Sequence, residues 1–186
     1  MGETLKRAIS GAVYVLLLLA SILYSTESFL ILFGIFLIIS IYEFCNLVQV
    51  NKTIPLISGT SIYVLIILIS NYYNLKAEDI QLLDIVLLAI TLLISIKCVV
   101  FLFDNSLQKI SNSSKYIYLL GYITLPFIFI TKISFGIKNY NPKIIIGLLI
   151  LIWTNDTFAY IVGKSIGKHK LFEKISPKRV LMLFEN

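Results

Sequence analysis

The sequence predicts an all-α integral membrane protein, a single polytopic domain over residues 1–186 with about six transmembrane helices. Hydrophobic residues make up 58% of the chain and its mean hydropathy is +0.91, whereas soluble chains are about 45–50% apolar. Charged residues are 14%, against about 25% in soluble domains. Such a chain cannot cover its outside with polar groups, so the lipid bilayer is the expected solvent.

Six apolar stretches, separated by short polar connections, define the expected helices. Each is close to the about 20 residues that cross the hydrocarbon layer at a rise of 1.5 Å per residue. The connections are rich in Ser, Asn, Thr and Lys, which are typical of turns. The predicted spans are about 8–24, 29–50, 54–73, 82–103, 116–131 and 144–162.

Three spans carry local signals. A cleaved signal peptide is the alternative for the first span, but no small-x-small cleavage pattern precedes Ser25 and more apolar segments follow, which favours an uncleaved helix. Pro55 lies in the first turn of the third span, where proline is tolerated. Gly121 and Pro126 predict a bend in the fifth span.

Glu43 and Lys97 are ionisable residues that lie inside predicted spans. Glu43 either reaches the headgroups or faces a polar cavity, because an acid within the bilayer costs about 2–3 kcal/mol. Lys97 is near the end of its span and is expected to extend its long stem to the interface. Cys45 and Cys98 lie in apolar segments without ligand spacing and are interpreted as small hydrophobic residues.

The distribution of Lys and Arg predicts the orientation. If the N-terminus is cytoplasmic, twelve of the sixteen Lys and Arg lie on the cytoplasmic side and four on the other, which favours cytoplasmic N- and C-termini. Three of those four, Lys132, Lys138 and Lys143, surround the connection before the last span, which is the weak point of the assignment. A basic cytoplasmic loop is expected after the last helix.

The stretch from Trp153 to Arg179 places polar residues inside the last span and a dense basic cluster after it. Six of the sixteen Lys and Arg lie between Lys164 and Arg179. On a helix Asp156, Tyr160, Gly163 and Gly167 share one face. One carboxylate beside many cations at a membrane surface suits a magnesium-bound polyphosphate next to a lipid phosphate. Such local basicity fits an anionic ligand or lipid surface better than nucleic acid.

Several other interpretations stay open. Asp156 could pair with Lys97 as a structural contact, the basic run could be a lipid-binding anchor, and Gly163 with Gly167 could be a helix-packing motif. A phosphate-binding P-loop is excluded because Phe158 stands where its first glycine is required. His169 is the only histidine, so no His-based metal site or Ser-His-Asp triad can form. At the level of function, the alternatives are a small transporter or channel-like bundle, and a non-catalytic scaffold with a polybasic tail.

The motifs themselves resemble a known family. The pattern Trp-x-x-Asp-Thr-x-Ala-Tyr-x-x-Gly-Lys-x-x-Gly-Lys-His-Lys-Leu, followed by Ile-Ser-Pro-Lys-Arg, is similar to the bacterial phosphatidate cytidylyltransferases, also called CDP-diglyceride synthases. Weaker agreement extends to Lys6-Arg7 and to Tyr42-Glu43-Phe44, where relatives also carry an acid flanked by aromatic residues.

The resemblance implies transfer of CMP from CTP to phosphatidate at the cytoplasmic face of a bacterial inner membrane, with Mg²⁺ as cofactor. The expected partners are CTP, phosphatidate and membrane lipids, with a homodimer as a further candidate and no nucleic acid. By resemblance Asp156 is catalytic and a metal ligand, and Lys178 and Arg179 are catalytic. The substrate-binding residues that it implies are Asn155, Tyr160, Lys164, Lys168, His169, Lys170, Ser176 and Pro177.

The chain departs from the family after Arg179. It reads Val-Leu-Met-Leu-Phe-Glu-Asn over 180–186, where relatives continue with Thr, Glu-Gly and further helices. We therefore expect an N-terminal portion of the enzyme, from a truncated or frameshifted reading frame. Its metal site would then lack the family's remaining carboxylates, and turnover would require a second polypeptide.

Overall fold

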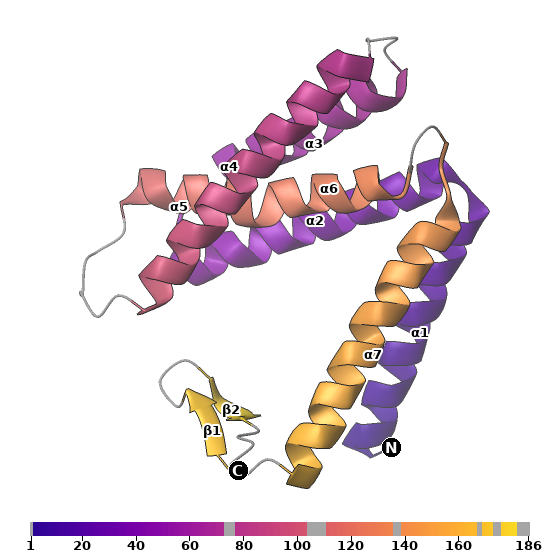
Figure 1. Cartoon of the computed structure of the whole chain (residues 1–186), viewed down its shortest axis with the longest axis vertical. Coiled ribbons are helices and arrows are strands. Elements are labelled where there is room, and N and C mark those ends of the chain that lie inside the picture. Colours follow the sequence, from indigo (N-terminus) through magenta and orange to yellow (C-terminus); the bar gives the residue numbers. More distant parts are fainter. Residues whose placement is uncertain are drawn as a thin grey trace. The chain divides into compact units, whose positions relative to one another are not determined.

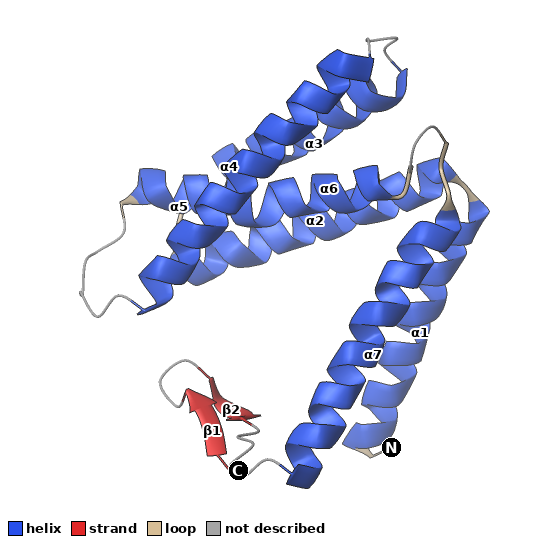
Figure 2. Cartoon of the chain, in the orientation of Figure 1, coloured by secondary structure: helices blue, strands red, loops and turns tan. Residues whose placement is uncertain are grey.

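The computed structural model describes residues 2–72, 77–103, 111–135, 139–166, 169–172 and 176–181. The chain divides into two compact units, Met1–Pro142 (unit 1) and Lys143–Asn186 (unit 2). Unit 1 is helical in its described part. Unit 2 contains one long helix and a two-stranded hairpin (Figure 2).

All six predicted apolar stretches form helices. Their bounds, in chain order, are α1 (Glu3–Tyr24), α2 (Thr26–Val48), α3 (Thr53–Tyr72), α4 (Ala77–Phe103), the composite of α5 (Asn112–Leu119), η1 (Leu120–Thr124) and α6 (Leu125–Ile133), and α7 (Pro142–Ile166) (Figure 1). Five helical segments are long and apolar enough to cross a bilayer, whereas the apolar part of α1, Ala8–Tyr24, is shorter. The chain is therefore a multi-span membrane protein.

Serines build the sharp corner between α1 and α2. Ser25 is the N-cap of α2: its side chain accepts a hydrogen bond from the backbone N–H of Ser28 at 3.1 Å, and the Ser28 Oγ accepts one from the Ser25 N–H. This reciprocal arrangement satisfies two N–H groups that a helix start leaves unpaired. Ser28 Oγ also donates to the carbonyl of Ser21 at 2.6 Å, which ties the end of α1 to the start of α2.

The core of unit 1 gathers around α2. Every fourth residue of α2 is buried, which places one stripe of the helix against its neighbours. Residues of α3, α5 and α6 complete the cluster, and α2 and α6 run side by side (Figure 1). The buried α2 residues are Phe29, Phe33, Leu37, Ile41 and Cys45.

The fifth predicted span is interrupted by the π-helical segment η1, between α5 and α6. Gly121 lies within η1, and Pro126 lies in the first turn of α6. Proline has no N–H and its ring collides with the carbonyl four residues earlier in a regular helix. The wider π turn just before Pro126 relieves this conflict, so the irregularity expected from Gly121 and Pro126 takes the form of a π segment.

The basic stretch after α7 requires a correction. It was expected to be a loop, but β1 (His169–Phe172) and β2 (Ser176–Leu181) pair as antiparallel strands. Each strand combines charged residues with a Leu-Phe or Val-Leu pair, and such apolar residues favour pleated, hydrogen-bonded backbone. The prediction of a loop was based on the charged residues alone and overlooked these apolar pairs.

Candidate functional site

Four of the predicted site residues lie on α7. Asn155, Asp156, Tyr160 and Lys164 are all exposed, and the helix is continuous through them. Asp156, Tyr160 and Gly163 therefore share one face of α7, as the spacing predicted. A Cβ added to Gly163 would meet nothing within 4 Å, so the backbone is open at this point. Gly167 and Lys168 lie outside the described residues.

The hydroxyls next to this face are already used by the helix. Thr157 Oγ1 donates to the carbonyl of Trp153 at 2.7 Å, and Ser165 Oγ donates to the carbonyl of Ile161 at 2.8 Å. In contrast, the described part of unit 2 contains no ion pair or hydrogen bond to the side chain of Asp156. Within the described part of unit 2, the exposed polar side chains of α7 without such a contact include the predicted site residues Asn155, Asp156, Tyr160 and Lys164, and also Thr154.

The hairpin places the remaining predicted residues on two paired strands. His169 and Lys170 are in β1, and Ser176, Pro177, Lys178 and Arg179 are in β2. His169 is opposite Leu181, Lys170 opposite Val180 and Phe172 opposite Ser176, with an irregularity between Lys170 and Phe172. For the hairpin the structure describes backbone only. The pairing brings two basic segments, separate in sequence, within one strand spacing of each other, about 5 Å.

The described part of unit 2 offers a single carboxylate for a metal, that of Asp156. No group of three or more His, Cys, Asp or Glu side chains is found among the described residues. A fully protein-built cage is therefore not part of this region. Mg²⁺ commonly binds through one or two carboxylates and completes its shell with water and substrate phosphates, and Asp156 on α7 fits that mode.

Glu43 and Lys97, which also lie inside predicted spans, are on the surface of unit 1. Glu43 is exposed on α2, five residues before its last residue, and Lys97 is exposed on α4. For Glu43 this placement favours the interface over a buried cavity, because about 7 Å of helix separates it from the end of α2. The alternative pairing of Asp156 with Lys97 would join the two units and stays a prediction.

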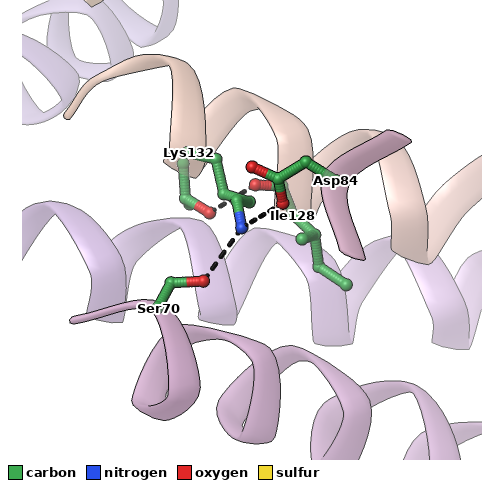
Figure 3. A network of polar contacts seen from close by, with 5 residues as sticks. Ser70, Asp84, Ile128 and Lys132 are labelled. Atoms are coloured by element: carbon green, nitrogen blue, oxygen red, sulfur yellow. Dashed lines mark hydrogen bonds and ion pairs between the residues drawn. The ribbon is translucent and has the colours of Figure 1, made fainter. Parts of the chain in front are cut away.

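One polar contact between helices was missed by the sequence analysis. Lys132 of α6 forms an ion pair with Asp84 of α4 and donates a hydrogen bond to Ser70 of α3 (Figure 3). The signal was present: Asp84 lies just inside the start of the fourth predicted span and Lys132 just after the end of the fifth. Alternating spans bring those two ends to the same side of the membrane.

The comparison with known families decides the relationship. A profile of the cytidylyltransferase family matches residues 5–182, which include the face of α7 and the hairpin. The chain belongs to the cytidylyltransferase family. Both α7 and the basic hairpin lie within the matched residues and therefore belong to the part of the chain that the family shares.

Curated relatives agree with this family. The chain is 25% identical over 191 residues to a phosphatidate cytidylyltransferase of Bacillus subtilis, covering 97% of this chain and 66% of the relative. It is 36% identical over 73 residues to one of Aquifex aeolicus and 35% over 71 residues to one of Rickettsia typhi, covering 27% and 31% of those relatives. The chain thus spans less than two thirds of the length of these relatives. No solved structure matches it.

Proposed function

We propose that the protein transfers CMP from CTP to phosphatidate, forming CDP-diacylglycerol and pyrophosphate. The observation that carries the proposal is the face of α7, where Asp156 and Tyr160 are exposed while the neighbouring hydroxyls bond to their own helix. An intramembrane acid without a partner among the described residues of its own unit is costly unless a ligand or another segment satisfies it. The names of the family and of the relatives point to CTP and phosphatidate as that ligand pair.

The reaction is a nucleotidyl transfer. A phosphate oxygen of phosphatidate forms a bond to the α-phosphorus of CTP, and the bond from that phosphorus to the pyrophosphate oxygen breaks. Pyrophosphate leaves with the electron pair. The protein's main task in such a displacement is to position the reactants and to offset the charge on the phosphates.

The residues of this chain divide that task. Asp156 would hold Mg²⁺, which when bound supplies charge neutralisation to the phosphate oxygens. Lys178 and Arg179 would bind the phosphates of CTP, because charge-assisted hydrogen bonds to phosphate are among the stronger polar contacts. The other residues assigned to the nucleotide or lipid phosphate are Asn155, Tyr160, Lys164, Lys168, His169, Lys170, Ser176 and Pro177.

We further infer six spans in a bacterial inner membrane, with both ends of the chain and the reaction on the cytoplasmic side. The twelve-to-four distribution of Lys and Arg supports this orientation. Lys132, which weakened the assignment, belongs to α6 and is paired with Asp84, so it is not a free charge of the connecting loop. A homodimer is part of the proposal and awaits a measurement of mass in detergent.

A binding experiment tests the proposed function. Purified chain in lipid nanodiscs is titrated with CTP in the presence of Mg²⁺ by calorimetry, as wild type and as Asp156→Asn. We expect saturable binding by the wild type and at least about tenfold weaker binding by the variant, since a lost charged contact costs about 1.5–3 kcal/mol. Glu43→Gln, which removes another intramembrane carboxylate, is the matched control and should bind like the wild type.

The same titration discriminates the alternatives. Absence of CTP binding by wild type, with Mg²⁺ present and the protein monodisperse, would contradict the proposal. Binding that is equally weakened by Asp156→Asn and Glu43→Gln would mean that the effect is general loss of membrane acids and not a site on α7. Substrate uptake into vesicles without any nucleotide binding would favour the transporter.

A further inference from the structure

Helix α4 lies on the surface of unit 1. None of the residues in its membrane-length segment, Ile80–Phe101, is buried. In a bilayer the hydrophobic effect does not hold such a helix against its neighbours, because lipid tails are as apolar as its side chains. Its position must therefore depend on close packing at particular points and on polar contacts between helices.

The first contact is the polar network at the N-terminal half of α4. Lys132 Nζ lies 2.5 Å from Asp84 Oδ1 and donates to Ser70 Oγ at 2.9 Å (Figure 3). The side chain of Lys132 is 15% exposed and that of Asp84 is 37% exposed. The ammonium group thus depends on its two partners, and the oxygen that it contacts, Asp84 Oδ1, is itself buried although the rest of that side chain is partly exposed.

The second contact is steric. A Cβ added to Gly121 of η1 would lie 2.8 Å from the Cβ of Ile94, a separation that real side chains do not adopt. The side chain of Ile94 therefore packs directly against the backbone of η1 at Gly121, where any larger residue would collide with it. We call this contact the Ile94–Gly121 seat. This seat is ten residues from Asp84 along α4, about 15 Å of helix, and it involves no charge.

We propose that the Asp84–Lys132 pair is a latch that holds the N-terminal half of α4 against α3 and α6, with the Ile94–Gly121 seat as its pivot. When the ion pair opens, the half of α4 around Asp84 swings away and the half beyond Ile94 stays in place. The two ends of one helix thus respond differently to the loss of a single charge. This device is independent of the proposed nucleotidyl transfer.

Distances between spin labels test the latch. Labels are attached through cysteines at two pairs of exposed positions, in a Cys98→Ala background that keeps the buried Cys45. The pair at positions 31 and 88 reports on the latch half, and the pair at 47 and 99 reports on the half beyond the pivot. The full chain in nanodiscs is used throughout.

The variants remove and restore the opposite charges. Asp84→Asn removes the ion pair, and Lys132→Met removes both the ion pair and the hydrogen bond to Ser70. Each variant should roughly double the width of the 31–88 distance distribution and leave the 47–99 distribution unchanged, since the contact between Ile94 and Gly121 is kept. The exchange Asp84→Lys with Lys132→Asp should return the 31–88 distribution to its wild-type width. Glu78→Gln, an exposed carboxylate on the same helix, should change neither.

Each other outcome would overturn the proposal. Unchanged 31–88 distances in both single variants would mean that the ion pair does not hold α4. Equal broadening at both ends would mean general loosening with no pivot, and failure of the exchanged pair to restore the width would mean that opposite charge is not what fixes the helix.

Discussion

Buried and half-buried polar side chains of unit 1 differ from the exposed polar side chains of α7 in the partners that they have. In unit 1, Tyr63 Oη donates to the carbonyl of Leu30 at 2.8 Å, and Lys115 Nζ donates to the carbonyl of Val48 at 2.8 Å. The first contact joins α3 to the preceding helix α2, and the second joins α5 to α2. Lys115 also places its charge at the negative end of α2. On α7, Asp156 and Tyr160 are exposed and project from one helix face. Polar groups in unit 1 hold the fold, and those on α7 are available to a ligand.

The largest effect expected on the binding side of this comparison comes from the hairpin. Lys178→Gln with Arg179→Gln should weaken CTP binding by about 100-fold or more, since hydrogen bonds to charged groups contribute about 1.5–3 kcal/mol each. Thermal unfolding should not change. Lys6→Gln with Arg7→Gln removes the same number of charges far from the hairpin in sequence, and an equal loss of affinity in that variant would contradict a specific role for the hairpin.

On the structural side, the largest effect should come from Gly121. Gly121→Ala forces its new Cβ against Ile94 and should destabilise unit 1 by about 1–3 kcal/mol, the usual cost of overpacking. The measurement is unfolding in mixed detergent micelles followed by circular dichroism. Gly147→Ala is the control because its Cβ would meet nothing within 4 Å. If Gly121→Ala and Gly147→Ala were equally stable, close packing of Ile94 on Gly121 would be contradicted.

Tyr140 allows a pH test of a structural contact. Its Oη donates to the carbonyl of Ile22 at 2.8 Å, and burial raises the pKa of Tyr140 to about 12. The neutral phenol is the favoured folded form, so its contribution is complete below the unfolded pKa of about 10 and is lost as the pH rises toward 12. Tyr140→Phe should therefore lose about 1 kcal/mol at pH 8 and fall less steeply than wild type between pH 10 and 12. If the stabilities of wild type and Tyr140→Phe fell in parallel between pH 10 and 12, a role for the Tyr140 hydroxyl would be contradicted.

The smallest effect is expected at Glu43. It is an exposed polar residue of unit 1, so it tests whether polar residues of this unit contribute to stability only when they are buried. Glu43→Gln should change unfolding by no more than about 0.5 kcal/mol, as is usual for surface positions. Stability measured in the same micelles decides this. A loss comparable to that of Gly121→Ala would show that Glu43 belongs to a polar cavity.

Much of the fold could be predicted because apolar length is a strong signal. The helix ends lie within about five residues of the expected bounds, as is usual for boundaries. The latch was missed because Asp84 and Lys132 are 48 positions apart, and only helix packing brings them together. The π segment was missed because Gly121 and Pro126 indicate an irregularity without specifying its form. For the site, the spacing correctly predicted that Asp156 and Tyr160 share one face of α7. The two strands of the hairpin were not predicted, because their many charged residues suggested a loop.

The central claim is that structural and ligand-binding polar residues are separate in this chain. The direct test measures unfolding and CTP·Mg²⁺ binding for two variants in the same nanodiscs and micelles, Lys132→Met and Asp156→Asn. The account predicts that Lys132→Met is destabilised by about 2 kcal/mol, as for loss of one partner of a partly buried pair, but binds like wild type. It predicts that Asp156→Asn unfolds like wild type but binds at least about tenfold more weakly. If both variants lost stability and binding in parallel, the separation would be contradicted.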